Sequence, residues 1–156
     1  MTQTQAEDVT TAIIETISRY YRAVQLRLPT EAPGIGAVTR EQWFVLLEVV
    51  KEGPDHLSMG ELAGRQGMAL NSATAIVDRL VNAGLLERRP DPADRRVVRV
   101  SATPAGGRLK AAISAARRAE YQRLLAELST EDLAALGAAL PALAHLAEAA
   151  HRTSRR

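Results

Sequence analysis

The sequence predicts a mainly α-helical chain with a small β-wing, in which a winged helix-turn-helix is flanked by N- and C-terminal dimerisation helices. The central residues 57–103 carry a short capped helix, a turn, an amphipathic helix and two short strands, in that order. Long segments with helical apolar periodicity lie on both sides of this stretch. Apolar residues make up 46% of the chain but aromatic residues only 3%, so Leu and Ala must do most of the packing.

The N-terminal part predicts a helix over residues 7–28, a break over 29–36 and a second helix from Thr39 to Gly53. The break contains two prolines and two glycines. Thr39 and Gln42 have the spacing of a capping box, in which each residue hydrogen bonds to the other's backbone. The apolar positions at helical spacing are, in the first helix, Val9, Ile13, Ile14, Ile17, Tyr20, Tyr21, Val24 and Leu28, and in the second, Trp43, Leu46, Leu47 and Val50.

The central part predicts a third helix with a second capping box, Ser58 with Glu61, followed by a turn at Gly67. A fourth helix is expected over residues 70–82, with Gly84 at its C-terminal end. On a helical wheel its apolar residues fall on one side, and Asn71, Ser72, Ala75 and Arg79 fall on the other, with Thr74 on the flank. The apolar side comprises Ala73, Ile76, Val77 and Leu80.

Two antiparallel strands are expected over residues 85–89 and 97–102, joined by a turn rich in Pro and Asp. Val98 and Val100 are expected on one face of the second strand. Thr103 and Pro104 then have the pattern of a helix start, and this helix should reach about residue 128. A last helix follows from residue 129, with Pro141 expected to kink or break it. Its apolar face is formed by Leu133, Leu136, Leu140, Leu143 and Leu146.

We divide the chain into residues 1–36 (N-terminal dimerisation helix and linker), 37–103 (winged helix-turn-helix unit) and 104–156 (C-terminal dimerisation helices and basic tail), all within one integrated domain. The Ala- and Leu-rich faces of the first, fifth and sixth helices have no obvious partner within a single chain. A second copy would cover them, so the sequence predicts a homodimer.

Charge is informative by its position rather than its total, because the net charge is only +2. A basic cluster lies between positions 79 and 99, and such a local cluster can hold phosphates; it comprises Arg79, Arg88, Arg89, Arg95, Arg96 and Arg99. The chain has no cysteine, which excludes disulfides and thiolate zinc sites. The N-terminus lacks the apolar run of a signal peptide, and no stretch approaches transmembrane length by inspection. These features predict a cytoplasmic protein without a membrane partner.

The chain resembles the MarR family of ligand-responsive transcriptional regulators over roughly residues 13–146. The most specific matching segments are 74–80 (TAIVDRL), 84–88 (GLLER), 94–96 (DRR) and 103–106 (TPAG), in this order and spacing. The resemblance implies a winged-helix homodimer that binds palindromic double-stranded DNA and is usually released by a small anionic or phenolic ligand. We therefore expect a sequence-specific DNA-binding regulator of transcription that acts as a repressor.

By position in the family, Asn71, Ser72 and Thr74 lie where the recognition helix enters the major groove. Arg96 lies at the wing tip, where the family inserts an Arg into the minor groove, and Asp94 is placed to orient Arg96 through a carboxylate–guanidinium pair. The basic cluster adds Arg79 and Arg95 as expected DNA contacts.

The same residues allow other readings, and the chain departs from the family at two positions. Asn71 and Ser72 could instead cap the fourth helix, and Arg88 is expected to brace the wing base against an acid. Position 75 is Ala where many members have Arg, which leaves the operator sequence open. Position 102 is Ala where Leu is usual, a smaller residue at the strand end.

A ligand site, if the chain has one, is expected at Tyr20, Tyr21, Trp43 and Leu47, with Arg19 or Arg22 facing an anion. Core and dimer packing is the other explanation of these side chains. A ligand-independent DNA-binding regulator is therefore an alternative function.

An enzyme is the alternative of another class, because His145, Glu148 and His151 have a spacing that could bind a metal in a helical bundle. The first and fifth helices lack matching ligands, and the chain has no phosphate loop or nucleophile motif. We therefore expect no metal, no cofactor and no catalytic residue.

Overall fold

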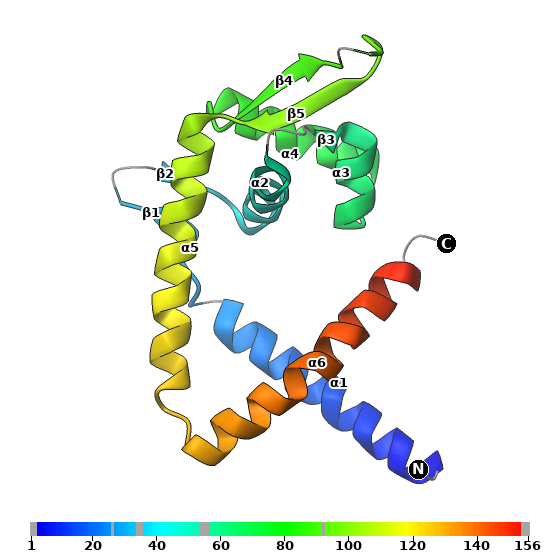
Figure 1. Cartoon of the computed structure of the whole chain (residues 1–156), viewed down its shortest axis with the longest axis vertical. Helices are drawn as coiled ribbons and strands as arrows, with labels where there is room; N and C mark the ends of the chain where they lie inside the picture. Colours follow the sequence, from blue (N-terminus) through cyan, green and yellow to red (C-terminus); the bar gives the residue numbers. More distant parts are fainter. Residues whose placement is uncertain (1–2, 26, 34–35, 54–56, 92, 154–156) are drawn as a thin grey trace.

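The computed structural model describes residues 3–25, 27–33, 36–53, 57–91 and 93–153. Its helices α2, α3 and α4 gather beneath a small sheet, while α5 runs away from the sheet toward α1 and α6 at the opposite end of the molecule (Figure 1). The elements follow in the order α1 (Gln3–Gln25), β1 (Glu31–Ala32), β2 (Gly36–Ala37), α2 (Arg40–Glu52), β3 (Leu57–Ser58), α3 (Met59–Gln66), α4 (Leu70–Asn82), β4 (Leu86–Pro90), β5 (Val98–Ala102), α5 (Pro104–Leu125) and α6 (Thr130–Thr153).

The core is centred on the winged helix-turn-helix, which it confirms, and it also takes in Ala32 before this unit and Leu109 and Ile113 of α5 after it. Leu46 of α2, Leu62 of α3, Leu80 of α4 and Leu109 of α5 are all fully buried in one cluster. The buried side of α4 is formed by Ala73, Val77 and Leu80, with Ile76 partly buried beside them, as its wheel predicts. Apolar burial therefore fixes α4 against α2 and α3, and leaves its opposite face outward.

The sheet has the order β3–β5–β4 and is antiparallel throughout. Arg88 of β4 pairs with Val100 of β5, and Leu57 of β3 pairs with Val100 from the other side. A second hairpin, β1–β2, pairs Glu31 with Ala37. The sequence did not predict β1, β2 or β3, because a strand of two residues has too few positions to show an alternating pattern.

The predicted helix starts are confirmed. Thr39 and Gln42 form a reciprocal capping box at α2, and Ser58 and Glu61 form another at α3. Hydrogen bonding to Ser58 holds the pKa of the Glu61 carboxyl below its usual range. Thr103 caps α5, with its hydroxyl oxygen accepting the N–H of Gly106 at 3.1 Å. These side chains satisfy N–H groups that would otherwise lack a partner at each helix start.

Gly106 lies at a close approach between α5 and the start of the wing. A Cβ at this position would lie 2.1 Å from the carbonyl oxygen of Leu85, whereas a Cβ at Gly107 would have nothing within 4 Å. Thr103 reinforces the same junction, because its hydroxyl donates to the carbonyl of Gly84 at 2.7 Å. The absence of a side chain at Gly106 therefore allows α5 to begin directly against β4.

The terminal helices leave their apolar faces exposed. Ile14, Tyr20 and Tyr21 of α1 are about half exposed, and so are the five leucines at three- and four-residue spacing on α6. The helix α6 continues through Pro141, so of the two expected outcomes, a kink or a break, the break is absent. The helix reaches Thr153, and the last three residues of the basic tail lie outside the described residues.

The expectation that no stretch approaches transmembrane length was wrong. In the described part of the chain, residues Thr130–Ala150 of α6 form one helical stretch of 21 residues that is long and apolar enough to cross a membrane, by length and composition only. Its charged residues, Glu131, Asp132 and Glu148, lie near the two ends, and Ala and Leu fill most of the rest. A helix that packs against another helix through an Ala/Leu face passes the same test, so the composition alone does not separate the two uses.

Candidate nucleic-acid interface

The outward face of α4 projects from the core and carries polar side chains. Asn71, Ser72, Ala75 and Arg79 are all exposed. Ala69 is the N-cap residue and makes no side-chain cap hydrogen bond. Asn71 and Ser72 therefore stand inside the first turn, and the alternative that they cap the helix is wrong. Both side chains are exposed in the first turn of α4. A side chain at this place in a winged helix can reach the edges of bases in the major groove.

Thr74 occupies the flank of this face and is partly buried. Its hydroxyl donates to the carbonyl oxygen of Leu70 one turn earlier, at 2.8 Å. The hydroxyl proton is thus committed to the backbone, and only the oxygen lone pairs and the methyl group are available to a ligand.

The wing is organised by Asp91, which sequence reasoning did not select. This carboxylate is buried at the end of β4. One of its oxygens accepts the N–H groups of Ala93 at 2.7 Å and Asp94 at 3.0 Å, and the other pairs with the guanidinium of Arg99. The Arg99 pair and the two N–H bonds hold the pKa of the Asp91 carboxyl below its usual range. The available signal was Asp91 at the start of a turn, where a carboxylate often accepts N–H groups two and three residues on.

Asp94 contacts Arg96 differently from the prediction. Its carboxylate accepts the backbone N–H of Arg96 at 3.0 Å, and the structure records no Asp94–Arg96 guanidinium pair among the described residues. Asp94 thus fixes the backbone of the wing tip, while the side chains of Arg95 and Arg96 are exposed.

The base of the wing is braced as predicted for Arg88. Its guanidinium pairs with Asp78 of α4 and so ties β4 to α4. Arg89 pairs with Glu87 at 2.8 Å, and Glu87 also accepts the hydroxyl of Ser101 at 3.2 Å. Val98 is exposed although Val100 is buried, because Val98 lies farther along the wing, beyond the core. Arg79, Arg95 and Arg96 are exposed and, among the described residues, have no recorded ion pair, whereas the exposed Arg89 is paired with Glu87.

The residues expected to hold a ligand lie where α1, α2 and α5 meet, but they differ in exposure. Trp43 is buried, and the guanidinium of Arg117 lies 4.6 Å from the centroid of its ring. The Nε of Arg117 donates to the carbonyl of Pro29 at 2.9 Å. Burial lowers the pKa of the Arg117 guanidinium. Trp43 is thus a packed side chain with a cation against its face, and Leu47 is partly buried against the same core.

The two tyrosines are half exposed on α1. Tyr20 hydrogen bonds with Tyr121 of α5, and burial together with this bond raises the pKa of the Tyr20 hydroxyl to about 12. Arg40 lies 6.0 Å from the ring of Tyr21. The charged groups beside the aromatic residues are therefore Arg40 and Arg117, whereas Arg19 and Arg22 line a separate hollow on α1.

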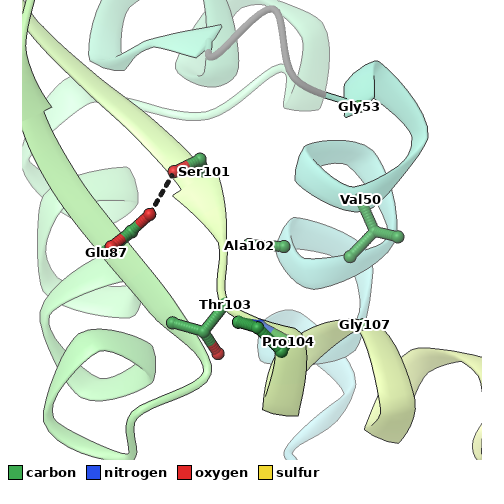
Figure 2. Close-up of a pocket in the computed structure, with 8 residues that line it drawn as sticks. All are labelled: Val50, Gly53, Glu87, Ser101, Ala102, Thr103, Pro104 and Gly107. Atoms are coloured by element: carbon green, nitrogen blue, oxygen red, sulfur yellow. Dashed lines mark hydrogen bonds between the residues drawn. The ribbon is translucent and has the colours of Figure 1, made fainter.

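A hollow of about 350 Å³ lies at the root of the wing, between α2, β5 and the start of α5 (Figure 2). Val50, Ala102 and Pro104 form its apolar wall, and Glu87 and Ser101 hydrogen bond to each other at its edge. The small Ala102 and Gly107 leave this space open. Neither this hollow nor the one on α1 is lined by Tyr20, Tyr21, Trp43 or Leu47, and of the residues expected near a ligand only Arg19 and Arg22 line the hollow on α1.

The chain combines a packed winged-helix core, an outward polar face on α4 and exposed arginines on the wing. These features place it in the class of nucleic-acid-binding winged-helix proteins. Within the residues that the structure describes, no three His, Asp or Glu side chains gather as metal ligands.

Comparison with known proteins identifies the family within this class of winged-helix proteins. The MarR family model matches residues 38–97. The HTH-type transcriptional regulator YsmB of Bacillus subtilis is 32% identical over 134 residues, which cover 86% of this chain and 90% of YsmB. The HTH-type transcriptional repressor MdtR of the same organism is 33% identical over 96 residues, covering 62% of this chain and 61% of MdtR. The crystal structure of RV1404 from Mycobacterium tuberculosis superposes with a TM-score of 0.72 at 26% identity, covering 88% of this chain and 92% of that one.

The chain belongs to the MarR family. It is a DNA-binding helix-turn-helix transcriptional regulator and not an enzyme.

Proposed function

We propose that the chain is a cytoplasmic repressor that binds a palindromic operator as a homodimer and leaves the DNA when a small aromatic or anionic ligand binds. The observation that carries this proposal is the exposed, uncapped start of α4, which presents Asn71 and Ser72 beside a basic wing. The relative MdtR is named a repressor, which supports repression rather than activation of transcription.

The apolar faces of α1 and α6 support the homodimer. Five exposed leucines on α6 lie on one helical face. Because each is already about half covered, burying the rest of one leucine contributes about 1 kcal/mol. A symmetric dimer presents two copies of α4, which read half-sites about one helical turn apart. The operator is therefore an inverted repeat of roughly 16–20 base pairs.

In this arrangement Asn71, Ser72 and Thr74 face base edges in the major groove, and Arg79 and Arg95 contact phosphates. Arg96 enters the minor groove, which is narrow and electronegative over A·T-rich steps. Asp94 contributes by fixing the wing backbone at Arg96.

Transcription in vitro from a promoter that overlaps the operator tests the repressor assignment. The operator is found by selecting bound fragments from the genome of origin, and the neighbouring genes identify the pathway. Added protein should lower transcript yield, and a control promoter without the operator should be unaffected. A rise in transcript yield from the operator promoter would show an activator instead.

The ligand proposal is supported by the position of the aromatic side chains between the terminal helices and the winged-helix unit. Trp43 and Leu47 lie on α2, which packs against both α4 and α5. Tyr20 and Tyr21 are half exposed on α1, Arg40 lies 6.0 Å from the ring of Tyr21, and Arg117 lies 4.6 Å from the ring of Trp43. An aromatic acid bound here would shift α2 and so the spacing of the two recognition helices. A preference of about 1.4 kcal/mol for the shifted shape lowers operator occupancy tenfold.

Fluorescence of Trp43, the only tryptophan, tests the ligand proposal. Aromatic acids and phenols are screened for a change in emission, and active compounds are then titrated with and without operator DNA. Linkage requires that the operator weaken ligand binding by the factor by which the ligand weakens DNA binding. A screen in which no compound changes emission or DNA affinity favours the ligand-independent alternative.

A further inference from the structure

The first turn of α4 exposes a leucine where a DNA-reading helix usually presents polar groups. Leu70 begins the helix and is 53% exposed, although its spacing of three and seven residues from Ala73 and Val77 puts it on the side that is buried farther along the helix. Ala75, also exposed, stands one turn from Asn71. Leu70 and Ala75 therefore provide exposed apolar surface before and after Asn71 in the first two turns of the helix.

The hydrogen-bonding capacity of this patch is smaller than its composition suggests. Leu70 and Ala75 carry no polar side-chain atom, and the Thr74 hydroxyl donates to the Leu70 carbonyl. Asn71 is thus the one side chain of these four that can both donate to and accept from a base. The amide of Asn71 therefore lies between two apolar side chains, with the exposed Ser72 hydroxyl and the Thr74 oxygen as the other polar atoms of the first two turns.

We propose that Leu70 and Ala75 read the C5-methyl groups of thymines that adjoin an adenine bound by Asn71. The thymine methyl is the apolar group that base pairs display in the major groove, and Asn binds adenine through its N6 and N7. The exposed cations Arg79, Arg95 and Arg96 on the same unit favour DNA as the occupant of this face. The inference rests on the proposed entry of α4 into the major groove and adds which chemical group it recognises there.

This reading gives Ala75 a function. A long cation at this position would hold the helix away from the base edges, whereas Ala lets the backbone approach until its own methyl touches the thymine methyl. Each half-site should therefore contain an adenine next to one or more thymines. Covering one methyl group changes affinity about fourfold, from the usual free energy of burying one carbon.

Deoxyuridine substitution in the selected operator tests the proposal, because it removes the methyl and keeps every hydrogen bond of the base. Thymines are replaced one at a time in both half-sites, and affinity is measured by fluorescence anisotropy. The wild-type chain should lose about fourfold per half-site at one or two positions. Leu70→Ala should bind more weakly and should lose the distinction between thymine and uracil at one of these positions, and Ala75→Ser should reduce it at another.

Arg79→Ala is the matched control on the same helix. Its affinity should fall while the thymine-to-uracil ratio stays as in the wild type. Leu70 and Ala75 are exposed, so their variants should keep the wild-type circular dichroism spectrum and melting temperature.

Two results would overturn the inference while leaving the proposed function in place. The wild type could bind its operator specifically and tolerate uracil at every position, or Leu70→Ala could retain the full uracil effect. Unchanged DNA binding by Leu70→Ala would assign the exposed leucine to a protein contact instead. A chain that selects no DNA sequence at all would overturn both the inference and sequence-specific repression.

Discussion

Asp91 determines the shape of the wing, because two N–H groups of the turn and the guanidinium of Arg99 on β5 converge on one buried carboxylate. Asp91→Asn keeps the size of the side chain and removes its charge. We expect this variant to bind the operator more weakly than Asp94→Asn does, since the carboxylate of Asp94 accepts a single recorded hydrogen bond in the described structure, from the N–H of Arg96. Affinities of the two variants on one operator check the order, and equal losses would contradict the central role of Asp91.

The pH dependence of the wing follows from the same carboxyl. The pKa of Asp91 is lowered in the folded chain, so its stabilising effect is fully present above the ordinary Asp pKa of about 3.9. It is lost as the pH falls from there through the lowered value. Between pH 5 and 8 the wing should therefore not titrate through Asp91. Operator affinity of Asp91→Asn relative to the wild type should stay constant over this range, and a ratio that varies with pH would contradict the assignment.

Arg96 and Arg88 are both wing arginines, yet they should respond differently to substitution. Arg96 is exposed, whereas Arg88 is paired with Asp78. Arg96→Ala should lower affinity and reduce the slope of log affinity against log salt by up to about one unit. Arg88→Ala should leave that slope unchanged, because a paired cation releases no phosphate counterion. Titrations at several salt concentrations on an operator with A·T-rich flanks compare the two.

The junction of the wing with α5 requires a residue without a side chain at position 106. Gly106→Ala would place a Cβ against the carbonyl of Leu85, so the helix start must shift, at a cost of about 1–3 kcal/mol in unfolding free energy. Gly107→Ala, the adjacent control, meets open space and should be neutral or stabilising by up to about 1 kcal/mol. Urea denaturation of both variants measures the difference, and equal stabilities would show that the contact relaxes without cost.

The helices that begin with a local signal were predictable from the sequence. Thr39, Ser58 and Thr103 mark their helix starts because the cap and its partner lie within three residues. The bounds of α4 also match the prediction, since its apolar stripe runs between a turn glycine and Gly84. What the sequence could not show depends on distant partners or on very short elements, such as β3 on β5 and the Asp91–Arg99 pair.

The candidate site shows the same limit. The outward positions Asn71, Ser72 and Arg79 follow from periodicity alone, whereas the exposure of Leu70 depends on where the helix leaves the core. The replacement of an Asp94–Arg96 side-chain pair by a backbone contact required the folded turn. The transmembrane-like composition of α6 was missed because its leucines were read as one face of a helix.

The stability of the central unit and the association of two copies use different parts of the chain. The core cluster contains none of the leucines of α6, which stay exposed. Leu140→Glu, at a position 57% exposed, should therefore leave the chain folded but weaken the homodimer. The substitution occurs twice in a symmetric dimer, so the dissociation constant should rise by a factor of about one hundred or more.

Sedimentation velocity over a range of concentrations measures this change. The wild type should show twice the chain mass at micromolar concentration, and Lys51→Glu, which alters charge on α2, should behave as the wild type does. A well-folded wild-type monomer at that concentration would exclude the dimer.

Sequence-specific binding by a pair of α4 helices is tested most directly by one comparison of affinities. The wild type and Asn71→Ala are titrated with a selected inverted repeat and with a duplex of the same composition in shuffled order. The wild type should prefer the repeat by a factor of about one thousand or more. Asn71→Ala should lose part of that preference, by about 1–3 kcal/mol per base contact, and keep its affinity for the shuffled duplex. Equal affinity of the wild type for both duplexes would contradict the account.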